Sequence, residues 1–121
     1  MRIYNAPTGD PMLIDAASGL SSLAQQVEAF AASASPLANF AAEICDTAEP
    51  YDEMLLGLRL KKGSGQQLTI SDDRWLELSA SQAEIRAFAA LLREPAAGDH
   101  RHLYCKPVSL IVEEGTPWLE A

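Results

Sequence analysis

The sequence Leu13-Ile14-Asp15-Ala16-Ala17-Ser18 recurs as Leu76-Glu77-Leu78-Ser79-Ala80-Ser81, 63 positions further along the chain. Each copy is followed by a segment whose apolar residues have helical spacing. We therefore interpret each copy as the end of a β-strand that leads into a helix. Because the spacing is about half of the 121 residues, the chain is expected to consist of two similar halves.

The first helix follows a strand predicted at Met12–Ala16, and Ser18 is its expected N-cap. Pro36 disfavours helical geometry in the residue before it, so the helix should end near residues 33–35. Apolar residues at intervals of three and four positions form one face of this helix: Leu20, Leu23, Ala24, Val27, Phe30 and Ala31.

The second helix begins with the spacing of a capping box, formed by Ser81 and Glu84. It should end before Pro95 and Gly98. Its apolar face has the same spacing as that of the first helix: Ile85, Phe88, Ala89 and Leu92.

Further strands are predicted where apolar runs are bounded by turn residues: Phe40–Cys45, Met54–Lys61, Gln67–Ser71, Arg74–Ser79, His100–Lys106 and Val108–Glu113. Gly63-Ser64-Gly65 predicts a hairpin turn, and Asp72-Asp73 predicts the solvent-facing tip of a second hairpin. Pro107 cannot donate a ladder hydrogen bond and marks a bend, a bulge or an edge.

These elements predict an α+β fold. Two amphipathic helices and about six strands can bury their apolar faces together in one mostly antiparallel sheet with both helices on one face. We expect a single domain over residues 1–121, built from two similar β-α-β-β units at about residues 11–62 and 74–114.

Acidic residues outnumber basic residues by 17 to nine, which gives a formal net charge of -8 at pH 7. Nucleic acids and anionic membranes repel a chain of this charge, so neither is an expected partner. No apolar stretch approaches the ~20 residues that span a bilayer, and no secretory signal is apparent at the N-terminus. We expect a cytoplasmic protein with a basic protein as its partner.

Acidic residues gather in two segments, the loop that contains Asp52 and the Asp72-Asp73 turn. Such runs are solvated in most proteins, but they can also steer a basic partner toward the surface. Trp75, next to the turn, can either pack in the core or anchor a partner, and the same holds for Trp118. The candidate partner-binding residues are Glu43, Asp46, Glu49, Asp52, Glu53, Asp72, Asp73 and Trp75.

His100 and His102 lie two positions apart on a predicted strand, so their imidazoles share one face and could contact one metal ion. Cys105 falls on the opposite face, which leaves the pair short of ligands. We expect a solvent-facing or hydrogen-bonded pair and no cofactor. Cys45 and Cys105 are expected to be buried thiols in central strands rather than activated nucleophiles.

The second half resembles the immunity protein 32 family, small bacterial proteins encoded beside polymorphic toxins and predicted to neutralise them. The matching segments are Leu76-Glu77-Leu78-Ser79, Gly98-Asp99-His100-Arg101-His102-Leu103 and Ser109-Leu110-Ile111-Val112-Glu113, with a helix after the first, and they cover about the last 50 residues. The resemblance implies a non-enzymatic protein whose acidic face meets a toxin. It carries over no catalytic residue.

Two alternatives stay open. The first is a small metal-dependent enzyme that uses the His100 and His102 pair. The second is a structural subunit that forms a homodimer through an exposed strand edge at Val108–Val112.

Overall fold

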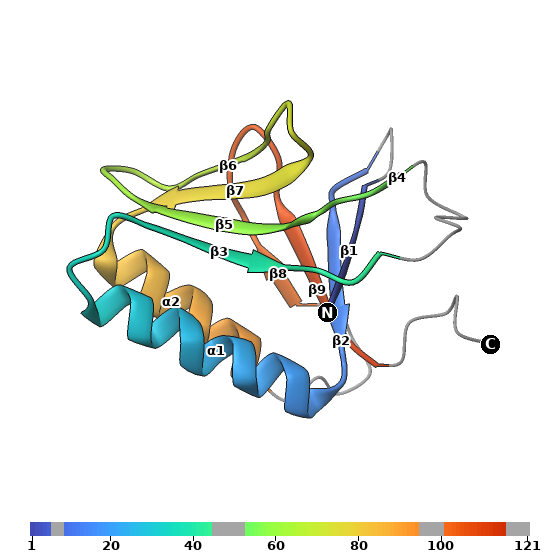
Figure 1. The fold of residues 1–121 in the computed structure, drawn as a ribbon, viewed down its shortest axis with the longest axis horizontal. Helices are drawn as coiled ribbons and strands as arrows, with labels where there is room; N and C mark the ends of the chain where they lie inside the picture. Colours follow the sequence, from blue (N-terminus) through green and yellow to red (C-terminus); the bar gives the residue numbers. More distant parts are fainter. Residues whose placement is uncertain (6–8, 45–52, 95–100, 116–121) are drawn as a thin grey trace.

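The strands form two sheets instead of the single sheet expected from the sequence. The computed structural model describes residues 1–5, 9–44, 53–94 and 101–115. In chain order the elements are β1 (Arg2–Asn5), β2 (Met12–Asp15), α1 (Ala17–Ala32), β3 (Leu37–Ala41), β4 (Glu53–Met54), β5 (Gly57–Lys62), β6 (Gln67–Ile70), β7 (Trp75–Ala80), α2 (Gln82–Arg93), β8 (Arg101–Leu103) and β9 (Leu110–Glu114). Within the described residues, sheet A has the strand order β4-β1-β2-β9-β8 and sheet B the order β3-β5-β7-β6 (Figure 1). Antiparallel pairing predominates, and the α+β class is confirmed.

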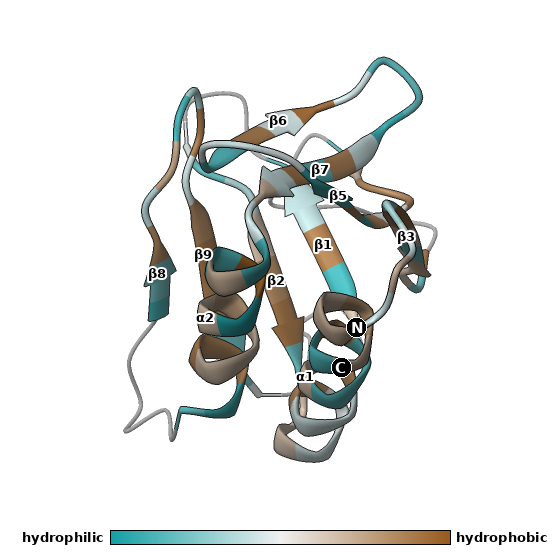
Figure 2. Cartoon of the chain, turned by 90° about the vertical axis from the view of Figure 1, so that its left-hand side faces the viewer, coloured by the Kyte–Doolittle hydropathy of each residue, from teal (hydrophilic) through white to brown (hydrophobic). Residues whose placement is uncertain are grey.

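Both sheets and both helices contribute to one apolar core. The helices run side by side and lie below sheet B in Figure 1, and Figure 2 shows the apolar stretches of β2 and β9 behind them. Side chains alternate along the strands, so Leu58 and Leu60 of β5 are buried while Arg59 between them faces outward. The helix residues in this core are Leu20, Leu23, Ala24, Val27, Phe30, Ala31, Ile85, Phe88, Ala89 and Leu92, which confirms both predicted faces.

The two helices begin differently. At α2 the predicted capping box is confirmed: the Glu84 N–H donates to Ser81 Oγ at 3.2 Å, and the Ser81 N–H donates to Glu84 Oε1 at 2.9 Å. At α1 the predicted N-cap Ser18 is wrong, because the N-cap is Ala16, whose side chain cannot accept a hydrogen bond. The Asp15 carboxylate accepts the Ala16 N–H at 2.8 Å one residue before the helix.

Several strand predictions need correction. The strand expected at 40–45 is β3 at Leu37–Ala41, because pairing with β5 begins directly after Pro36. The segment 63–65 does not close a hairpin, because β7 lies between β5 and β6. The turn at Asp72-Asp73 does close one, between β6 and β7.

The strand edge proposed at Val108–Val112 for self-association is also corrected. β9 lies inside sheet A, parallel to β2 on one side and antiparallel to β8 on the other. Its backbone groups therefore already have neighbours on both sides.

Each sheet combines a hairpin from the first half of the chain with a hairpin from the second. In sheet A the β1–β2 hairpin joins the β8–β9 hairpin through the parallel pair β2 and β9. In sheet B the β6–β7 hairpin joins the antiparallel strands β3 and β5 through the parallel pair β5 and β7. The two halves are thus related by an approximate two-fold symmetry, in which each half contributes one antiparallel strand pair to each sheet.

In this relation, equivalent positions of the hairpins and helices are 65 residues apart. The spacing between the two similar sequence segments was 63 residues. The two N-caps, Ala16 and Ser81, are 65 positions apart. The acceptors of two matching hydrogen bonds have the same spacing, because the Gly115 N–H donates to Asp15 O and the Gly63 N–H donates to Ala80 O, both at 2.9 Å. The same offset superposes the buried helix positions, for example Leu23 on Phe88.

The two helix starts give a paired test. Ser81→Ala should lower the free energy of unfolding by about 1 kcal/mol, because the Glu84 N–H loses its acceptor. Ser18→Ala is the matched control and should change it by less than about 0.5 kcal/mol, since Ser18 caps nothing. Urea denaturation measures both, and equal losses would contradict these N-cap assignments.

Candidate functional site

Five of the predicted partner-binding residues converge at one end of sheet B. Two backbone hydrogen bonds hold the segments together: the Ala42 N–H donates to Leu56 O at 2.9 Å, and the Leu56 N–H donates to Arg74 O at 2.8 Å. The end of β3, the start of β5 and the start of β7 therefore meet. We call the surface formed there by Glu43, Glu53, Asp72, Asp73 and Trp75 the acidic end.

The carboxylates of the acidic end differ in their contacts. Glu43 is 67% exposed and lies 3.5 Å from the amino group of Met1. Glu53 accepts a hydrogen bond from Asn5 Nδ2 at 3.0 Å and lies 3.7 Å from Arg74 Nε. Asp72 is exposed at the tip of the β6–β7 hairpin. Glu43 and Asp72 are thus both exposed to solvent.

Exposed apolar side chains accompany these carboxylates. Ile44 is 52% exposed and follows Glu43, and Leu56 is 36% exposed between Ala42 and Arg74 in the backbone ladder. The sequence patterns did not single out either residue, because exposure at a strand end depends on which segments meet there. Apolar side chains inside a polar rim are typical of protein interfaces.

Asp73 belongs to an ion-pair network on the outer face of sheet B. Arg59 binds Asp73 at 3.0 Å and Glu77 at 3.1 Å, and Lys61 binds Glu77 at 3.1 Å. The hydrogen bond from Arg59, together with one from Ser71, lowers the pKa of Asp73. The charge of Asp73 is therefore largely compensated within the chain, unlike that of Asp72.

Glu77 is the most buried carboxylate of this network. Burial opposes its ionisation, but the hydrogen bonds and charges of Arg59 and Lys61 outweigh this effect and lower its pKa. Its hydrogen bonds to Asp73 and Glu77 raise the pKa of Arg59 in turn. These four side chains keep the middle of the outer face close to neutral.

Trp75 lies on the outer face of sheet B rather than in the core, and it is only partly exposed. Its ring covers Gly57, where an added Cβ would stand 2.4 Å from Trp75 Cζ3. The guanidinium of Arg59 lies over the ring, 5.0 Å from its centroid. These contacts hold the partly exposed indole in place beside the acidic residues.

Several of the other predicted candidates lie outside the described residues: Asp46, Glu49, Asp52, Cys45, His100 and Trp118. His102 stacks on Tyr104, with ring centroids 5.4 Å apart. Among residues 1–5, 9–44, 53–94 and 101–115, no group of three or more His, Cys, Asp or Glu side chains could hold a metal ion.

Cys105 follows β8 and is half-buried, so its predicted place inside a central strand is wrong. Burial raises the pKa of its thiol, although a hydrogen bond from Gln66 Nε2 at 3.2 Å acts in the opposite direction. A thiol with a raised pKa is a poor nucleophile at neutral pH, because little thiolate is present. The helices of the described segments are also too short or too polar to cross a membrane.

The network around Glu77 predicts a specific pH dependence of stability. Its lowered pKa stabilises the fold above the usual value of 4.5, and this contribution is lost as the pH falls through the lowered value. Glu77→Gln should therefore cost about 1 kcal/mol at neutral pH, and this cost should shrink as the pH falls below 4.5. Glu94→Gln, at an exposed site after α2, is the control. Urea denaturation as a function of pH measures both, and a pH-independent loss in Glu77→Gln would contradict the ion pairs.

Comparisons with protein-family models, with curated proteins and with solved structures found no match for the chain. Its function is therefore inferred from the charge, exposure and contacts of the residues described above.

Proposed function

We propose that the chain is a non-enzymatic binding protein that covers a basic surface of a protein partner with its acidic end. In the form that the sequence resemblance suggests, it is an immunity-type protein and the partner is a toxin. Occlusion of the partner's surface would neutralise the toxin without any chemical step.

The observation that carries this proposal is the convergence of the acidic end. Glu43, Glu53 and Asp72 come from three separate segments of the chain, yet the Ala42–Leu56–Arg74 backbone ladder holds them at one end of sheet B. A shared location gives several carboxylates one direction of approach for a partner.

The chemistry of the acidic end also fits a protein partner. Ile44 and Leu56 supply exposed apolar area, and the fixed indole of Trp75 supplies an aromatic anchor. Aromatic anchors dominate the energetics of many interfaces, and rim charges mainly accelerate association. The net charge of -8 extends this attraction to a basic partner over a longer range.

Association kinetics test the proposal with the protein encoded by the neighbouring reading frame as the probe. The double variant Glu43→Lys/Asp72→Lys should slow association by roughly tenfold at about 50 mM salt, and the difference should shrink at about 300 mM salt. The control Glu28→Lys/Glu94→Lys makes the same charge change on the helices and should have a much smaller effect. Glu28 pairs with Arg93, and an exposed pair of this kind contributes at most about 1 kcal/mol.

Two results would contradict the proposal. One is the absence of any complex with the neighbouring protein. The other is an equal loss of association rate in both double variants, because net charge alone, and not the acidic end, would then explain the attraction.

A further inference from the structure

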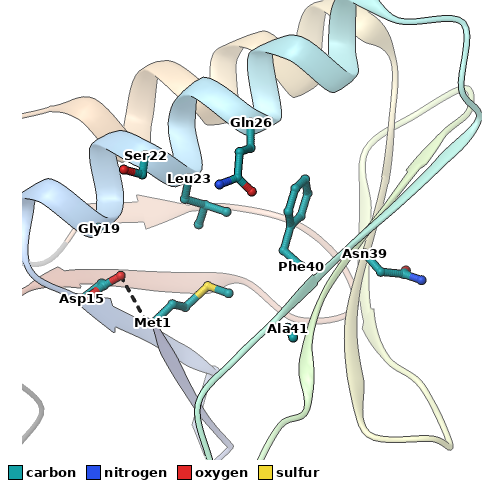
Figure 3. Close-up of a pocket in the computed structure, with 9 residues that line it drawn as sticks. All are labelled: Met1, Asp15, Gly19, Ser22, Leu23, Gln26, Asn39, Phe40 and Ala41. Atoms are coloured by element: carbon teal, nitrogen blue, oxygen red, sulfur yellow. Dashed lines mark ion pairs between the residues drawn. The ribbon is translucent and has the colours of Figure 1, made fainter.

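A cleft opens between α1, the end of β2 and the edge strand β3. Its volume is about 380 Å³, within the range of small-ligand sites. Figure 3 shows the Asp15 carboxylate at one end, the Phe40 ring rising from β3 toward α1, and the Gln26 amide hanging from the helix above.

The fold does not require this cleft, because the second half has different side chains at the equivalent positions. At the spacing of 65 residues, Leu23 corresponds to the larger, fully buried Phe88. Gln26 corresponds to Leu91, and Asp15 corresponds to the buried Ala80. The first half thus has smaller or more polar residues where the second half is apolar. This difference between the halves points to a use for the cleft.

The polar groups of the cleft favour a cation. Asp15 Oδ1 accepts the Ala16 N–H, and its Oδ2 lies 3.1 Å from the Met1 amino group. Glu43 approaches the same nitrogen at 3.5 Å, so two carboxylates share one ammonium and leave a surplus negative charge. Gly19 makes room for the Asp15 carboxylate, because an added Cβ would stand 2.0 Å from Oδ2.

The remaining lining suits an apolar arm that ends in that cation. Leu23, Met1 and the Phe40 ring form the apolar walls, and an aromatic face attracts an ammonium or guanidinium group. The exposed amide of Gln26 can accept a further N–H. A lysine or arginine side chain has this combination of an alkyl stem and a charged head.

We propose that the cleft binds one lysine or arginine side chain of the basic partner. This assignment rests on the proposed function, and Glu43 connects the two surfaces because it belongs to the acidic end and lies 3.5 Å from the amino group of Met1, which lines the cleft. The acidic end would attract the partner, and the cleft would fix its register by taking one cationic side chain.

The binding chemistry is tested first with small probes, by amide chemical shifts in solution. n-Butylguanidinium and n-butylammonium should shift the Asp15, Gly19 and Phe40 amides saturably, with a Kd on the order of millimolar. Pentanoate and 1-butanol, of similar size, should not. Equal binding of 1-butanol, or no saturable shift with either cation, would overturn the assignment.

The decisive variant is one that fills the cleft. Leu23→Phe/Gln26→Leu installs the side chains that the second half already carries at the equivalent positions, and it should weaken n-butylguanidinium binding at least tenfold. Gln25→Leu, at an exposed position of the same helix, is the matched control and should leave binding unchanged. Should the double variant fail to fold, Asp15→Asn removes the charge and should produce the same loss. Unchanged binding in the folded variant would overturn the proposal.

The same variants separate this inference from the proposed function. If a partner side chain occupies the cleft, Leu23→Phe/Gln26→Leu should raise the Kd for the partner about tenfold, whereas Gln25→Leu should not. If the partner's Kd is unchanged although n-butylguanidinium binding is lost, the cleft takes a free organic cation, and its assignment to the partner is wrong. If neither probe nor partner responds but Glu43→Lys/Asp72→Lys still slows association, the cleft assignment fails and the proposed function stands.

Discussion

The fold depends on two parallel strand pairs that join the halves of the chain. β2 pairs with β9 in sheet A, and β5 pairs with β7 in sheet B. Each pair links residues distant in sequence, so neither sheet can be completed by one half of the chain. The apolar faces of α1 and α2 are buried in the core that these exchanged hairpins create. Loss of either parallel pair would expose core residues of both halves.

Of the two proposed binding surfaces, the cleft lies where the two-fold relation between the halves breaks down. The acidic end forms because β3, β5 and β7 present their adjoining segments at the same end of sheet B. The cleft forms because Asp15, Leu23 and Gln26 replace the apolar or larger residues that the second half carries. The two similar halves thus share one architecture, and the differences between them create the proposed cleft. The core positions that match, such as Ala24 and Ala89, are those that both halves need for packing.

Local patterns predicted the elements better than their pairing. The helix faces and the Ser81 capping box were predictable, because side chains three or four positions apart settle them. Ser18 was the wrong N-cap because the helix begins two residues earlier, where Asp15 and not the N-cap side chain accepts a hydrogen bond. The division into two sheets was missed because strand pairing is non-local, and β1 was not predicted. The charge pattern of the sequence identified the acidic residues. Their position at one end of sheet B, and the cleft, could be recognised only from the pairing of the strands.

The most direct test of this account is to divide the chain between Ser64 and Gly65, in the connection from β5 to β6. Residues 1–64 and 65–121 would be produced separately and then mixed, with thermal unfolding followed by circular dichroism. Each half alone should lack a cooperative transition as a monomer, because each contributes only one hairpin to each sheet. An equimolar mixture should form a 1:1 complex that unfolds cooperatively. A single half that unfolds cooperatively as a monomer would contradict the shared core.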